Sequence, residues 1–155
     1  MPVDIKTLLG NPRTGFTPIE DVARFEGDPN YVEGALCMDI DGIPLITAEY
    51  WDDVNWLWPF VVEASQACEE TGHGETLFPD QGIEFRLDRL GDSGRVRASL
   101  TSSNDSRAAV MMASEFYPAL AHAGLHFFGH LERLVPAAAD VDGEQIAALR
   151  RWQQR

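Results

Sequence analysis

Residues 31–47 have the sequence YVEGALCMDIDGIPLIT, and this stretch decides the fold. Apolar and polar residues alternate up to Asp41-Gly42, a dipeptide that favours the two-residue turn of a β-hairpin. A turn at that point places Ile40 opposite Ile43 on the apolar face. Pro44 cannot donate a hydrogen bond to a neighbouring strand, so the second strand of this hairpin is predicted to lie at a sheet edge.

A second hairpin is predicted over residues 82–102. Apolar residues again alternate with polar ones, and Gly91-Asp92-Ser93-Gly94 supplies the turn. This register places Asp88 opposite Arg97 on the polar face, where a pair of opposite charges stabilises the hairpin slightly.

Helices are predicted over residues 48–71, 107–134 and 143–153, because apolar residues there recur at spacings of three and four. The order ββαββαα predicts an α+β fold, a two-layer sandwich. About four mainly antiparallel strands would carry two long helices on one face, with a short C-terminal helix. Residues 1–29 are rich in proline and glycine, which predicts an irregular arm docked on a single domain over residues 30–155.

The charge of this 155-residue chain is concentrated in its first half. The net charge is −13, and residues 1–80 hold sixteen acidic and three basic residues, whereas residues 81–155 hold nine of each. A negative field repels phosphate backbones and attracts basic proteins, so we expect a basic protein partner and no nucleic acid. Acidic residues also keep proteins soluble, and this alternative stays open.

The sequence predicts a cytoplasmic protein. Charged residues interrupt every apolar run before the ~18 residues that a membrane span needs, and the chain does not begin like a signal peptide. Cys37 and Cys68 form no C-x-x-C motif and are expected to be reduced. No cofactor is expected, because no phosphate loop or nucleophile motif occurs.

A partner-binding surface is predicted from the densest group of carboxylates together with an aromatic residue: Asp39, Asp41, Asp52, Asp53 and Trp56. An exposed tryptophan beside carboxylates is typical of contact surfaces. The carboxylates could also hold Mg²⁺ or act as acid and base, although they equally suit a turn and a helix start. Trp56 could instead be covered by the N-terminal arm.

A metal site is the second hypothesis. His122, His126 and His130 follow one another at spacings of four, and two imidazoles at that spacing on a helix can share one zinc ion. The alternative is a half-buried polar border of the helix. A metal-dependent enzyme would use this face, but the H-E-x-x-H pattern of metalloproteases is missing.

Four segments carry a resemblance over residues 31–102: Tyr31-Val-Glu-Gly-Ala-Leu, Asp39-Ile-Asp-Gly42, Trp51-Asp-Asp-Val-Asn-Trp-Leu-Trp58 and Phe78-Pro-Asp-Gln81. In these segments the chain resembles small bacterial proteins of the immunity type found in polymorphic toxin systems. The resemblance implies a two-layer α/β fold and neutralisation of a toxin, and it assigns no functional residue.

The first hypothesis is therefore a non-enzymatic acidic module that binds a basic protein, as an immunity-type inhibitor would. The histidine metal site is the alternative, and a sensor with a small-molecule cleft between the helices and the arm ranks third. The sequence also allows a homodimer through the open face of the sheet.

Overall fold

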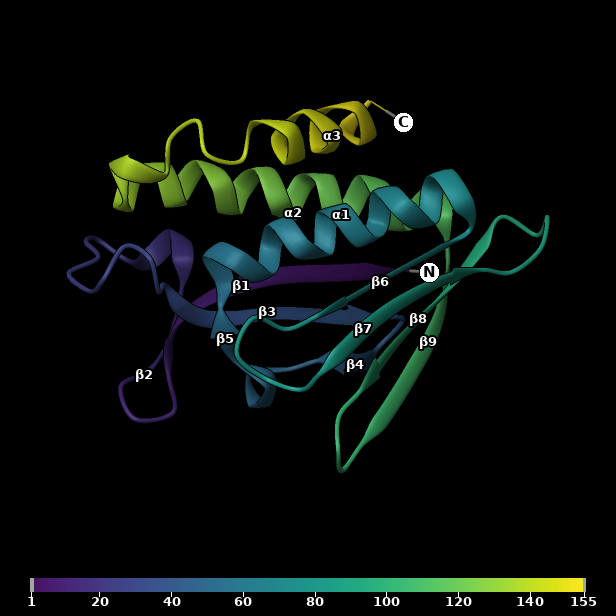
Figure 1. Ribbon diagram of the computed structural model, residues 1–155, viewed down its shortest axis with the longest axis horizontal. Helices are drawn as coiled ribbons and strands as arrows, with labels where there is room; N and C mark the ends of the chain where they lie inside the picture. The colour runs from purple at the N-terminus through teal and green to yellow at the C-terminus, as the bar shows by residue number, and fades with distance from the viewer. Residues whose placement is uncertain (1, 155) are drawn as a thin grey trace.

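Two antiparallel sheets and three α-helices form the computed structural model, within the described residues 2–154 (Figure 1). In the first sheet the strands lie in the order β2-β1-β3-β4, and β5 pairs with β3 beyond the end of β4. Its strands are β1 (Val3–Asn11), β2 (Gly15–Pro18), β3 (Glu33–Ile40), β4 (Ile43–Ile46) and β5 (Asp52–Asp53).

The second sheet is a simple meander in the order β6-β7-β8-β9. Its strands are β6 (His73–Leu77), β7 (Glu84–Arg89), β8 (Arg95–Thr101) and β9 (Ser106–Met112). β4 of the first sheet contacts β8 and β9, so the two sheets meet along that edge.

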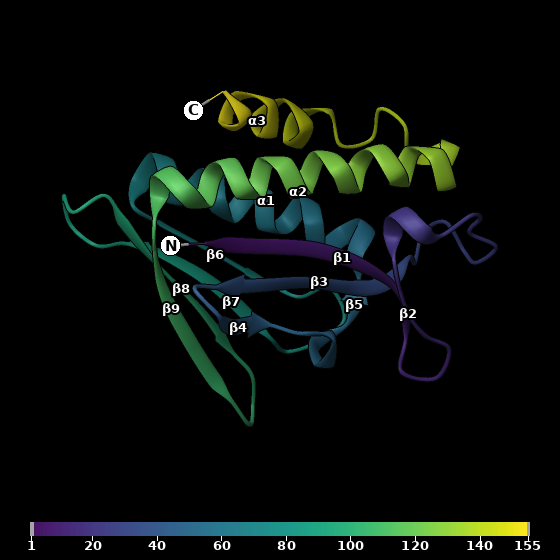
Figure 2. The same cartoon turned by 180° about the vertical axis from the view of Figure 1, so that it is seen from behind.

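The long helices lie side by side on one side of the sheets, as both views show (Figures 1 and 2). α1 (Val54–Thr71) packs on β6, β7 and β3, and α2 (Ala113–Leu134) packs on β1. α3 (Gly143–Gln153) lies on the outer side of α2 and also contacts α1. Short 3₁₀ turns complete the chain: η1 (Ile19–Asp21), η2 (Ala48–Tyr50) and η3 (Pro136–Ala138).

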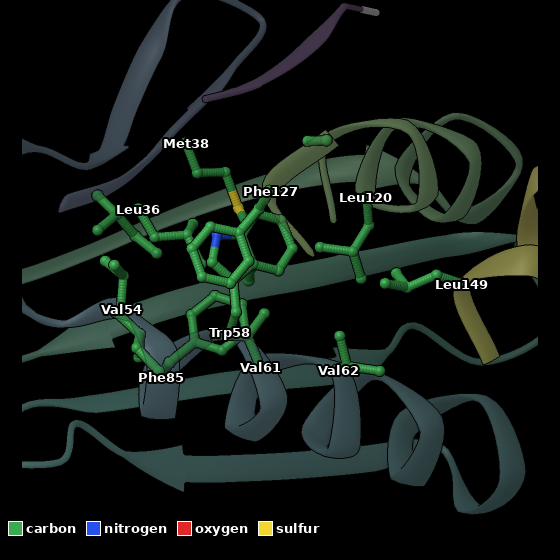
Figure 3. Packing of buried hydrophobic residues seen from close by; sticks show 14 of the residues in the cluster. Leu36, Met38, Val54, Trp58, Val61, Val62, Phe85, Leu120, Phe127 and Leu149 are labelled. Atoms are coloured by element: carbon green, nitrogen blue, oxygen red, sulfur yellow. The ribbon is translucent and has the colours of Figure 1, made fainter. Parts of the chain in front are cut away.

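Trp58 of α1 joins the helices to the first sheet in the core (Figure 3). Its side chain is fully buried and stacks on Phe127 of α2, with 5.6 Å between the ring centroids. Its indole nitrogen donates a hydrogen bond of 2.9 Å to the Thr7 hydroxyl on β1. A buried tryptophan needs such an acceptor, so this one residue ties β1, α1 and α2 together.

Both predicted hairpins are confirmed. Asp41 and Gly42 have φ angles of 51° and 81°, as a two-residue hairpin turn requires, and Ile40 lies opposite Ile43. In the second hairpin Asp88 lies opposite Arg97, as predicted. The α+β class with two long helices on one side is also confirmed, although the single predicted sheet is in fact two sheets.

The prediction of an irregular arm over residues 1–29 was wrong for residues 3–18, because β1 forms an interior strand of its sheet and β2 pairs with it, whereas residues 22–29 are irregular as expected. β1 pairs in antiparallel register with β2 on one side and β3 on the other. Pro12 lies in the turn after β1, and Pro18 ends β2. Prolines at strand ends remove no hydrogen bond from the interior of a ladder, so their number did not exclude a strand.

Two predicted helices begin later than expected. Residues 48–53 form η2 and β5, so α1 begins at Val54, and residues 107–112 belong to β9, so α2 begins at Ala113. Alanine and methionine are compatible with a helix, and pairing with β8 overrides that preference in β9.

Cys37 is partly buried, Cys68 is buried, and the two form no disulfide in this structure. Within residues 2–154, none of the helices combines the length and the apolar character that crossing a membrane requires.

Candidate functional site

β5 holds two adjacent carboxylates against the first residues of β3. Asp53 lies opposite Glu33 and Asp52 lies opposite Gly34 in antiparallel register. A methyl group at position 34 would overlap the carbonyl oxygen of Leu8 on β1, so glycine allows the strands to approach closely here. On the β5 side of β3, Glu33 and Asp53 are direct cross-strand neighbours, an arrangement in which like charges repel each other.

The turn between β6 and β7 lies beside β5 (Figure 1), and it carries a third aspartate, Asp80. The backbone N–H of Asp80 donates to both carboxylate oxygens of Asp52, at 3.3 and 3.2 Å. The side-chain amide of Gln81 donates to the carbonyl oxygen of Trp51. These bonds fix the turn on β5, and one carboxylate oxygen from each of Asp52, Asp53 and Asp80 lies within 4.8 Å of the others.

The three aspartates differ in burial and in hydrogen bonding. Asp52 is 3% exposed, and its carboxylate accepts the N–H of Asp53 at 2.7 Å in addition to that of Asp80. Asp53 is 5% exposed, and within the described chain its carboxyl group receives no hydrogen bond from any N–H or O–H donor other than the Asp80 carboxyl. A buried carboxylate without a donor or a positive neighbour is costly, so Asp53 is the least satisfied member of the cluster.

Burial and repulsion raise the pKa of Asp53 to about 7. Burial is the largest cause, followed by the hydrogen bond to the Asp80 carboxyl and by the charges of Asp80, Asp52 and Glu33. Burial also raises the pKa of Asp52, against the opposing effect of the two N–H groups that it accepts. The fold therefore disfavours the charged forms of Asp52 and Asp53, and a positive charge beside them would relieve this cost.

Two hollows meet at these carboxylates. The larger has a volume of about 720 Å³ and the smaller of about 300 Å³, and both are lined by Glu33, Asp53 and Asp80. No lysine, arginine or histidine of the described chain lines either hollow. We call the larger one the acidic hollow.

The walls of the acidic hollow are of two kinds. Apolar and aromatic side chains come from β1 and from the segment before β3: Leu9, Val22, Phe25 and Tyr31. Asn11 and Asp28 contribute polar groups. Asn11 donates to Glu33 at 3.0 Å through its side-chain nitrogen, and its side-chain oxygen accepts the N–H groups of Arg13 and Thr14, so Glu33 is held in place.

Trp56 lies at the start of α1, three residues after Asp53. Its ring is 46% exposed, and its indole nitrogen donates to the carbonyl oxygen of Asn30 at 2.9 Å. Asn55 donates to the same oxygen and accepts the N–H of Val32. Trp56 lines a small groove of about 200 Å³ together with Pro29 and Asn30, whereas Asp28 and Tyr31 line the acidic hollow.

The five residues predicted to form one partner-binding surface lie in two separate places in the structure. Asp52, Asp53 and Trp56 lie at the start of β3, whereas Asp39 and Asp41 lie at its other end, about 20 Å away along the strand. Asp39 and Asp41 are exposed, and Asp41 forms the hairpin turn.

The sequence did not identify three carboxylates that line the acidic hollow: Asp28, Glu33 and Asp80. Asp80 lies 27 residues after Asp53 in the sequence and joins the cluster only in the folded chain. A local sequence pattern cannot predict such a contact. The pairing of β5 with β3 could have indicated Glu33, had residues 52 and 53 not been assigned to a helix.

The three histidines on α2 lie on a surface that faces the N-terminal segment. His126 contacts the Glu20 carboxylate at 3.2 Å, and Arg133 donates to the ring nitrogen Nδ1 of His130. His122 is exposed. Asp52, Asp53 and Asp80 are the one group of three metal-ligating side chains found in residues 2–154, so the histidines are not gathered into such a group.

Comparisons with protein-family models, with curated proteins and with solved structures found no match to this chain. The candidate site therefore has to be interpreted from its own geometry and charge.

Proposed function

We propose that this protein is a non-enzymatic binding module that takes a positively charged group of a basic protein into the acidic hollow. One observation carries the proposal: Asp28, Glu33, Asp53 and Asp80 line the hollow, and no basic residue of the described chain lines it with them. Opposite charge on a partner would relieve this repulsion and would speed the encounter.

The surroundings of the hollow support a protein as the partner. Residues 20–33 hold five acidic residues and one basic residue, so the negative charge extends along the exposed segment above the hollow. Tyr31, which lines the hollow, is 58% exposed, and Trp56, which lines the neighbouring groove with Pro29 and Asn30, is 46% exposed. Exposed aromatic residues beside a charged cleft are typical of protein contact surfaces. A basic protein toxin would be a partner of this kind, as the immunity-type resemblance implies.

A comparative capture experiment tests the proposal. The bait proteins are the wild type, the hollow variant Asp28→Asn/Glu33→Gln, and the control variant Asp39→Asn/Asp41→Asn, which removes the same charge at the other end of β3. Each is incubated with lysate of the source cell at low and high salt, and bound proteins are quantified by mass spectrometry. We expect a basic protein that high salt releases, and that the hollow variant retains about tenfold less than the control does, a difference of about 1.4 kcal/mol.

Two results would contradict this function. Equal losses with both variants would mean that only the overall negative charge matters. Full retention by the hollow variant would mean that the partner binds elsewhere.

A further inference from the structure

We infer that Asp52, Asp53 and Asp80 form a binding site for one divalent cation that prefers oxygen ligands, and that Ca²⁺ suits it best. This inference does not depend on the proposed protein partner. It concerns the purified chain alone. The cation site can therefore be disproved while the partner proposal holds, and the partner proposal can be disproved while the cation site holds.

The geometry fits a single ion. Ca²⁺ takes oxygen ligands at about 2.3–2.6 Å, so two ligands on opposite sides of it lie up to about 5 Å apart. One oxygen from each aspartate already lies within 4.8 Å of the other two. The three oxygens can therefore contact one ion with little movement of the backbone.

The second observation is the state of Asp53. A residue that is 95% buried normally has its polar atoms satisfied, yet the Asp53 carboxyl meets only another carboxyl group among the described residues. It also lines both hollows at the place where they meet. An ion there would supply the positive partner that the protein does not.

Asp52 is oriented in advance for such a role. Its carboxylate accepts the N–H groups of Asp53 and Asp80, so its orientation is set before an ion arrives. Backbone bonds of this kind hold ligating carboxylates in place in metal sites. The bonds from the Asp80 N–H also hold the turn that carries Asp80 against β5, which carries Asp52 and Asp53.

The surroundings favour Ca²⁺ among the divalent cations. The polar side chains that line the hollows carry carboxylates, amides and hydroxyl groups, and no histidine or cysteine of the described chain lines them, which disfavours zinc and copper. Glu33 lies opposite Asp53 and could add an oxygen, and the open hollows leave room for water ligands. Ca²⁺ tolerates an irregular set of six to eight oxygens, whereas Mg²⁺ demands a near-ideal octahedron.

Calorimetry on the purified, chelator-treated protein tests the site. CaCl₂, MgCl₂ and MnCl₂ are titrated separately, with NaCl at matched ionic strength as the blank. We expect one Ca²⁺ per chain with a Kd of about 10⁻⁴–10⁻³ M, as for calcium sites in extracellular modules. Ca²⁺ should also raise the Tm, and Mg²⁺ should bind more weakly.

Variants locate the ion. Asp53→Asn and Asp80→Asn should each weaken Ca²⁺ binding at least tenfold, whereas Asp39→Asn, which removes one exposed charge from the far end of β3, should leave it unchanged. Asp80 is on an exposed turn, so its variant is expected to fold even if the Asp53 variant does not. Three results would overturn the site. The first is that the wild type binds none of the three ions. The others are that Asp80→Asn leaves the affinity for Ca²⁺ unchanged, or that Asp39→Asn lowers it as much as Asp80→Asn does. Tighter binding of Mg²⁺ than of Ca²⁺ would overturn the assignment of the ion.

Discussion

Replacing Asp53 by asparagine should raise the stability of the protein at pH 8 in the presence of a chelator, even though the residue is buried. Asparagine keeps the shape of the side chain and removes a buried charge that faces Asp52, Asp80 and Glu33. The raised pKa of Asp53 sets a ceiling of about 4 kcal/mol, and the exposed position of Asp80 lowers the expected gain to about 1–2 kcal/mol. For a chain of this length the gain corresponds to roughly 2–8 °C in Tm.

The dependence of this effect on pH has a definite sign. The pKa of Asp53 is about 7 in the folded protein, above its ordinary value of 3.8. The folded state therefore binds the proton more tightly than the unfolded state does, and the wild type loses stability as the pH rises from about 4 through 7. At pH 5 Asp53 is protonated, and the wild type and the variant should be about equally stable.

Thermal unfolding followed by circular dichroism at pH 5 and pH 8 measures both effects. Asp39→Asn is the control, because it removes one exposed charge outside the cluster and should change the Tm little at either pH. A variant Asp53→Asn that is less stable than the wild type at pH 8 would show that the carboxylate makes favourable contacts, which would contradict the account of the site.

Gly74→Ala should be strongly destabilising, by about 2–3 kcal/mol or roughly 4–12 °C in Tm. Gly74 lies on β6 directly against α1, and an added methyl group would overlap the carbonyl oxygen of Ala64. It would also lie 3.1 Å from the backbone nitrogen of Cys68, so neither side can yield without moving the helix. The substitution thus separates α1 from the second sheet.

Gly82→Ala is the matched control for this prediction. Gly82 is in the turn before β7, and a methyl group there meets no atom within 4 Å, so a change of at most about 0.5 kcal/mol is expected. Chemical denaturation of both variants compares them directly. Equal stability of the Gly74 variant and the wild type would contradict the close packing of β6 on α1.

The hairpins could be predicted from the sequence because their information is local. Asp41-Gly42 needs only its own backbone angles to set the turn, so the pairing of Ile40 with Ile43 could be predicted. The same is true of the pairing of Asp88 with Arg97, which follows from the length of the turn between them. In the first hairpin the register then shifts between Asp39 and Met38, and no local signal in the sequence indicates this shift.

The interior strand β1 and the strand β9 could not be predicted in this way. β1 is stabilised by its two neighbours, which come later in the chain, and the prolines around it suggested an irregular segment. β9 has a composition that also suits a helix, and its pairing with β8 decides between the two states.

The sequence grouped Asp52, Asp53 and Trp56 correctly as neighbours at the junction of β5 and α1, although Trp56 lines a separate groove. The sequence joined them to Asp39 and Asp41 by proximity along the chain, whereas the hairpin carries those two residues to the far end of β3. The site instead gains Asp80 from a distant turn and Glu33 from the neighbouring strand. Both contacts arise from tertiary structure, and spacing along the chain contains no signal for them.

The central claim is that the acidic hollow is the surface that binds a basic protein. Hydrogen–deuterium exchange of the protein, alone and with the basic protein recovered by capture, tests it most directly. If the hollow binds the partner, exchange should slow on binding in residues 25–33, 52–56 and 78–82, which surround the hollow, and should not change in residues 37–44. Protection confined to residues 37–44 or to the histidine-bearing face of α2, with none around the hollow, would contradict it.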